Sequence, residues 1–150
     1  MTDNSITLKI PGTDVIVGSP VDNFRVVPGG TFENERMGKN GETYQHQSLD
    51  QAPPTPNVPG EPVHAAVGGT IVYAGETKGF GYHVLVETPL GGDKYLYTNY
   101  NHLIEPDDKG ASLIGKGVSP GTLIGKEGNS GACAAWMGWI TPSASIRPTC

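Results

Sequence analysis

Glycine and proline interrupt this chain too often for long helices to form. The 150 residues include 22 glycines and 13 prolines, and both residue types are unfavourable in a helix interior. Three runs rich in β-branched and aromatic residues, at 70–74, 82–87 and 94–102, are separated by glycine- and proline-containing turns. Such runs are typical of strands. The sequence therefore predicts a mostly antiparallel β domain with these three runs as a meander.

Length, charge and the chain start exclude several classes of protein. A chain of 150 residues favours a single domain. The formal net charge of -5 at pH 7 argues against a nucleic-acid partner, because phosphate binding needs an excess of Lys and Arg. No run approaches the roughly 20 apolar residues of a membrane span, and the first residues show no signal-peptide pattern. Cys133 and Cys150 are too few for a disulfide scaffold.

A proline-rich segment divides the chain into two parts. Residues 51–60 contain four prolines, which exclude a helix or a central strand and predict a connection over the surface. Before it, short apolar runs alternate with turns. After it come the predicted meander and a glycine-rich stretch at 117–128. The frequent glycines around a few apolar residues in this stretch suit a small, tightly turning barrel or sandwich.

His46 and Asp50 form a His-x-x-x-Asp pair. Neutral imidazole and carboxylate are both good zinc ligands. On a straight strand the two Cα atoms would lie about 13 Å apart, too far for one metal ion. The pair can bind zinc only where the chain bends, so we predict a bent strand end here. Taken alone, such a pair is more often a solvated turn.

His102 ends the third strand-like run. A period of two places it on the same face as Leu96, Thr98 and Tyr100, and its position at a strand end suits the rim of a pocket. His64 begins one predicted strand and His83 lies within another. Both are expected to be packing or surface residues.

The order of these segments is more specific than any one of them. After the His-x-x-x-Asp pair come GEPVHAAVGGTIVYAG at 60–75, GFGYHVLV at 79–86, YNHL at 100–103 and VSPGTLIGKEGNSG at 118–131. This succession resembles the lysostaphin and LytM type of zinc metalloendopeptidase, which hydrolyses peptides of bacterial peptidoglycan. The resemblance extends over roughly residues 20–135.

The resemblance implies a fold, a cofactor and roles for four residues. The implied fold is a small two-layered antiparallel β fold of the duplicated hybrid motif type, with long loops forming a groove. His46 and Asp50 would be Zn²⁺ ligands, and His102 would activate the attacking water or stabilise the oxyanion. Tyr100 would line the groove that binds peptidoglycan peptides. Residues 1–150 would form one domain, with 1–20 as an N-terminal extension and 136–150 as an atypical tail.

One element of the family pattern is missing. The family places a His-x-His element shortly after the Gly-x-Ser/Thr-Gly turn, and this element supplies the third zinc ligand and a further catalytic imidazole. Here no histidine follows His102, and Cys133 lies too early to replace it. The chain is a truncated or frame-altered product, or a degenerate member, or its site is completed by another chain. We expect weakly held zinc and reduced activity.

Two other functions remain open. The first is a non-catalytic module that binds the cell wall or has a structural role, for example in a phage tail or lysis apparatus with other virion or lysis proteins as partners. Without a signal peptide, the protein would reach the wall after lysis or as part of a phage particle. The second is a carrier-like barrel, because 120–126 resembles turns in lipoyl and biotinyl domains. Lys126 argues against it, since its neighbours are Gly125 and Glu127 rather than hydrophobic residues.

Overall fold

The structure is an antiparallel assembly of β-strands. The computed structural model describes residues 8–9, 12–22, 25–26, 34–37, 40–45, 51–52, 60–128 and 138–139. All regular elements in these ranges are strands, and all of their pairings are antiparallel, which confirms the predicted fold class. The strands are β1 Leu8–Lys9, β2 Ile16–Val17, β3 Arg25–Val26, β4 Glu35–Met37, β5 Thr43–Gln45, β6 Gln51–Ala52, β7 Pro62–His64, β8 Gly69–Thr77, β9 Gly81–Gly91, β10 Lys94–Leu103, β11 Gly117–Val118, β12 Leu123–Lys126 and β13 Gly138–Trp139.

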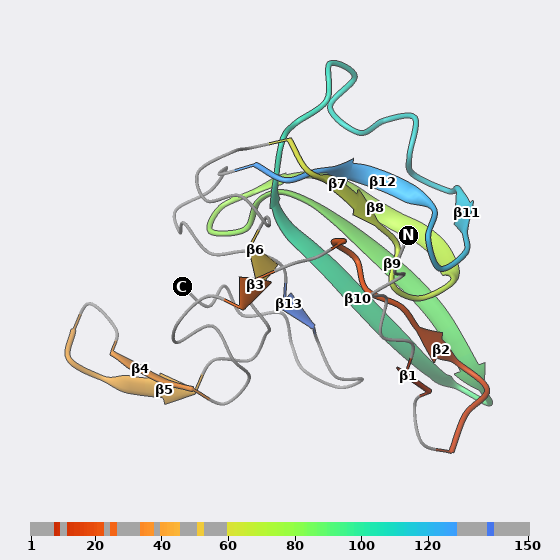
Figure 1. The fold of residues 1–150 in the computed structure, drawn as a ribbon, viewed down its shortest axis with the longest axis horizontal. Helices are drawn as coiled ribbons and strands as arrows, with labels where there is room; N and C mark the ends of the chain where they lie inside the picture. Colours follow the sequence, from red (N-terminus) through yellow and green to blue (C-terminus); the bar gives the residue numbers. More distant parts are fainter. Residues whose placement is uncertain are drawn as a thin grey trace.

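The predicted meander forms the centre of the largest sheet. Its strand order is β11-β8-β9-β10-β13, and Figure 1 shows the three long strands lying side by side. Gly91 and Gly92 turn the chain from β9 into β10 with φ values of 98° and 60°, a conformation that a residue with a Cβ rarely adopts. The three strand predictions are confirmed, and β8 and β9 extend beyond the predicted runs.

One face of this sheet carries the hydrophobic core. Ile71 pairs with Val86, and Val86 pairs with Thr98 in the next strand. The two-stranded ribbon β7–β12 contributes Val63 and Ile124 to the same core. Each fully buried aliphatic side chain of this kind stabilises the fold by about 1.5–3 kcal/mol. The buried members of the core are Val21, Val63, Ala65, Ala66, Val67, Ile71, Ala74, Tyr82, Val84, Val86, Leu96, Tyr100, Leu103 and Ile124.

The β1–β2 hairpin belongs to the same packed unit. Val15 and Val17 pack against the core, and Val21 just after the hairpin is fully buried. The residues predicted to form an N-terminal extension therefore contribute to the core where the structure describes them. Nothing in the described residues forms an apolar helix of membrane-spanning length.

The end of β10 contains a β-bulge that changes which side chain faces the core. The register shifts between Tyr100 and Leu103, and Leu103 pairs with Tyr82. A bulge inserts one extra residue and so moves the following side chains to the opposite face. Leu103, which is fully buried, takes the core position that strict alternation assigns to His102. The prediction that His102 shares a face with Leu96, Thr98 and Tyr100 is therefore wrong.

Two short strands flank the His-x-x-x-Asp pair. β5 ends at Gln45, and β6 begins at Gln51 and pairs with β3. Gln51 is buried, so the predicted surface segment 51–60 is wrong at its first residue. Residues 53–59 lie outside the described part of the chain.

Candidate functional site

The two predicted zinc ligands are bracketed by strands but are not themselves described. His46 and Asp50 follow β5 and precede β6, and residues 46–50 lie outside the described ranges. The bent strand end predicted for them stays a prediction. Cys133 and Cys150 also lie outside the described residues.

His102 occupies the bulge of β10 in an uncommon backbone conformation. Its φ is 61°, a left-handed value that few residues other than glycine adopt. The backbone N–H of His102 donates a hydrogen bond to the carbonyl of Phe80 at 2.8 Å, and the side chain is only 5% exposed. Bulges and left-handed residues of this kind are over-represented beside active sites.

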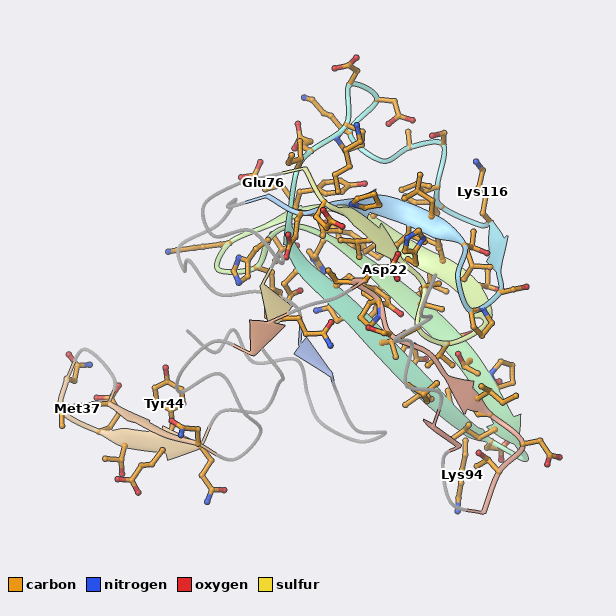
Figure 2. All side chains as sticks on the ribbon, viewed as in Figure 1. Asp22, Met37, Tyr44, Glu76, Lys94 and Lys116 are labelled. Carbon is orange, nitrogen blue, oxygen red and sulfur yellow. The ribbon has the colours of Figure 1, made fainter. Side chains whose placement is uncertain are left out.

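His102 lies at the end of the sheet where β8 and β9 are joined. Tyr82 pairs with Leu103 on one side and with Glu76 on the other. Figure 2 labels Glu76 near this end of the long strands and Lys94 at the far end. The turn between β8 and β9 and the bulge of β10 are thus neighbours in space.

Tyr100 lies in the hydrophobic core. Its side chain is 3% exposed, and its hydroxyl oxygen accepts a hydrogen bond from the backbone N–H of Ala66 at 2.8 Å. Burial raises the pKa of the Tyr100 phenol, which keeps the phenol neutral at physiological pH. This placement favours a structural role, and contact between Tyr100 and a substrate stays a prediction.

His83 forms a polar network on the opposite face of the sheet. Its Nδ1 lies 2.7 Å from Asn99 Oδ1, and its Nε2 lies 2.9 Å from Thr77 Oγ1. Because an amide oxygen can only accept, Nδ1 carries the proton and donates it to Asn99. In the neutral ring Nε2 then accepts from the Thr77 hydroxyl. The rings of Tyr73 and Phe80 flank the imidazole, at centroid distances of 4.9 Å and 5.3 Å.

The environment of His83 favours its neutral form. Burial lowers the pKa of His83; the hydrogen bond to Asn99 acts in the opposite direction, and the nearby His102 lowers the pKa further. If both imidazoles were protonated, their two positive charges would repel each other. His83 is therefore neutral at pH 7 and lies close enough to His102 to influence it electrostatically.

The expectation that His83 is a packing or surface residue is correct about its burial, but sequence reasoning missed its position beside His102. One feature of the sequence could have predicted the contact between His83 and Asn99. Side chains alternate between the two faces along each strand, which places His83 and Asn99 on the face opposite Val84 and Thr98. Pairing the strands in register was needed to bring the two polar residues together.

The described side chains do not by themselves form a zinc site. They contain no cluster of three His, Cys, Asp or Glu residues that could hold a metal ion, whereas a catalytic zinc site uses three protein ligands. His46 and Asp50 have suitable donor atoms, but no histidine follows His102 in the sequence. Zinc binding by His46 and Asp50 stays a prediction.

Comparison with known families identifies the family of this chain. The sequence model of peptidase family M23 matches residues 44–138, a range that includes His46, Asp50 and His102. The match covers more than half of the chain, and the chain therefore belongs to peptidase family M23. No curated protein sequence matches it.

Three solved structures have a similar fold. A protein assigned to peptidase M23 from Pseudomonas aeruginosa is 25% identical, with 82% of this chain and 43% of that chain covered and a TM-score of 0.51. A zinc-containing peptidase from Vibrio cholerae is 21% identical, with 89% and 45% covered and a TM-score of 0.59. The Csd3 protein of Helicobacter pylori is 17% identical, with 90% and 36% covered and a TM-score of 0.56. The chain thus spans less than half the length of each of these proteins.

Proposed function

We propose that this chain is a zinc-dependent peptidoglycan endopeptidase domain whose hydrolytic activity is reduced by the missing third ligand. The observation that carries the proposal is the M23 match over 44–138, which contains His46, Asp50 and His102 in the order that the family uses. The similar fold of a zinc-containing peptidase supports the same chemistry. We further propose that residues 1–150 act as one domain at the cell wall.

Each of the three residues has a proposed role. His46 and Asp50 would hold zinc, which when bound supplies a Lewis acid for the scissile carbonyl. His102 would accept and return a proton at its ring nitrogen beside the reacting peptide. Support for the role of His102 comes from its place at a bulge, its φ of 61° and the fixed hydrogen bond of its backbone N–H.

The reduced activity follows from coordination chemistry. Two ligands hold zinc weakly and in poor geometry, so most of the purified protein would lack the metal without added zinc. The same deficit favours a second candidate function, a non-catalytic module that binds peptidoglycan or serves a structural role in a phage tail or lysis apparatus. In either case the wall would be reached after lysis or from a phage particle.

Zinc content and peptidoglycan hydrolysis of the purified full chain test the proposal. We expect substoichiometric zinc, with slow release of peptide termini from purified peptidoglycan that increases with added zinc. His46→Ala should lose both zinc and hydrolysis. His102→Ala should keep the zinc of the parent and lose about 10²- to 10⁴-fold in rate, the usual contribution of a general base. His64→Gln is the control, because His64 lies on β7 and is not one of the three residues with a proposed role.

The outcomes separate the two candidate functions. Peptidoglycan binding that survives His46→Ala, with no hydrolysis by any form at saturating zinc, would establish the binding module instead of the enzyme. Absence of zinc, hydrolysis and peptidoglycan binding together would contradict both.

A further inference from the structure

The polar network around His83 is connected to His102 through Phe80. The Phe80 ring lies against the His83 imidazole at 5.3 Å, and the Phe80 carbonyl accepts the backbone N–H of His102 at 2.8 Å. Phe80 therefore contacts His83 through its ring and His102 through its backbone carbonyl. Phe80 is itself buried, with 6% exposure, which leaves it little room to adjust.

A second connection passes through β10. Asn99 accepts the Nδ1–H of His83 and lies three residues before His102 on the same strand. Asn99 is 1% exposed and His83 is 5% exposed, so this bond is shielded from water. Shielded hydrogen bonds hold their geometry better than exposed ones, because breaking them leaves buried polar atoms without partners. His83 thus connects the turn after β8 to β10 just before the bulge.

We propose that His83 is a positioning residue for His102, which holds the β10 bulge and the His102 imidazole in place through Phe80 and Asn99. The inference rests on the role of His102 in the proposed function and extends it to a residue outside the family's site positions. His83 itself is not expected to touch the substrate, because both of its ring nitrogens already have partners.

The groups around His83 come from β8, from the turn after it and from β10. Tyr73 and Thr77 face it from β8, Phe80 faces it from the turn, and Asn99 and His102 face it from β10. Of these neighbours, His102 is the one with an ionisable imidazole, and its charge lowers the pKa of His83.

The test compares two variants with matched controls in the full chain. His83→Gln removes the imidazole, and Thr77→Val removes only the hydroxyl that bonds Nε2 while keeping the size of the side chain. The controls are His64→Gln, a histidine on β7, and Thr70→Val, an exposed threonine on the same strand as Thr77. The readouts are the ¹⁵N-histidine titration of His102 and the hydrogen exchange of its backbone amide.

We expect His83 in the parent to show the Nδ1–H neutral tautomer. His83→Gln should make the His102 amide exchange about tenfold faster, as loss of support for one shielded hydrogen bond predicts, and should displace the His102 titration midpoint. Thr77→Val should displace the His102 ring resonances in the same direction as His83→Gln, but by a smaller amount. Where the chain hydrolyses peptidoglycan, both variants should lower kcat and leave KM unchanged, whereas a purely structural loss would lower only the melting temperature.

Equal His102 titration midpoints and amide exchange in His83→Gln and His64→Gln would overturn the proposal. If His83→Gln does not fold, Thr77→Val decides: His102 resonances identical to those of Thr70→Val would overturn it. These readouts need neither zinc nor hydrolysis. Failure of the proposed function would appear as absent activity with the His102 shifts still present, and is therefore distinguishable from failure of this inference.

Discussion

The two faces of the β8–β9–β10 sheet differ in how their side chains are held. On the core face, Ile71, Val84 and Val86 are fully buried among other apolar groups. On the opposite face, His83 and Asn99 are buried almost as completely but interact through directed hydrogen bonds. Apolar packing depends on volume and tolerates similar shapes, whereas a buried polar pair depends on particular atoms. The first face stabilises the fold, and the second fixes the geometry beside His102.

The largest expected effect is on the core face. Ile71→Ala removes a fully buried side chain opposite Val86 and should lower the free energy of unfolding by about 2–5 kcal/mol. Urea denaturation measures this loss. Val72→Ala on the same strand is the control, because Val72 is 38% exposed and its loss should be below about 1 kcal/mol. Similar losses in the two variants would show that the two faces are not distinct.

The pH dependence of stability tests the polar face. The pKa of His83 is lowered in the folded state from its ordinary value of 6.5, so the unfolded chain binds more protons. Stability from His83 is therefore fully present above pH 6.5 and is lost as the pH falls through that value toward the folded-state pKa. We expect the difference in urea midpoint between about pH 7.5 and about pH 5.5 to shrink in His83→Gln. A difference equal to that of His64→Gln would contradict this assignment.

The smallest expected effect lies farther along the same polar face. The Tyr97 hydroxyl donates to Glu87 at 2.8 Å, and this hydrogen bond raises the pKa of Tyr97. Both residues are half-buried, and pairs that water can still reach contribute little to stability because water competes for both partners. Tyr97→Phe should leave the melting temperature unchanged in a thermal scan. A clear decrease would extend the polar network from His83 toward Glu87.

Much of the fold follows from local sequence. The runs at 70–74, 82–87 and 94–102 became β8, β9 and β10 because β-branched and aromatic residues suit strands and the glycines between them permit tight turns. The period of two predicted the wrong face for His102, because this residue lies in a bulge with a φ of 61°. Its backbone N–H there bonds the carbonyl of Phe80, a partner 22 positions earlier in the chain. Local periodicity contains no information about such a partner.

The candidate site was only partly predictable. The order of motifs identified the family, which the M23 match confirms, and predicted His46, Asp50 and His102 as site residues. The same reasoning predicted contact between Tyr100 and the substrate, which stays a prediction; the structure shows that the Tyr100 side chain is part of the core. The burial of Tyr100 involves a partner distant in sequence, because its hydroxyl oxygen accepts a hydrogen bond from the backbone N–H of Ala66, 34 positions earlier.

The sequence by itself determined the class of fold, the family and the count of four histidines, because composition, turn residues and motif order are properties of the chain alone. Tertiary structure decided that His83 lies beside His102 and that the bulge turns Leu103 rather than His102 into the core. The physical reason is that hydrogen bonds and burial act between residues distant in sequence, and these contacts exist only once the strands are paired in register.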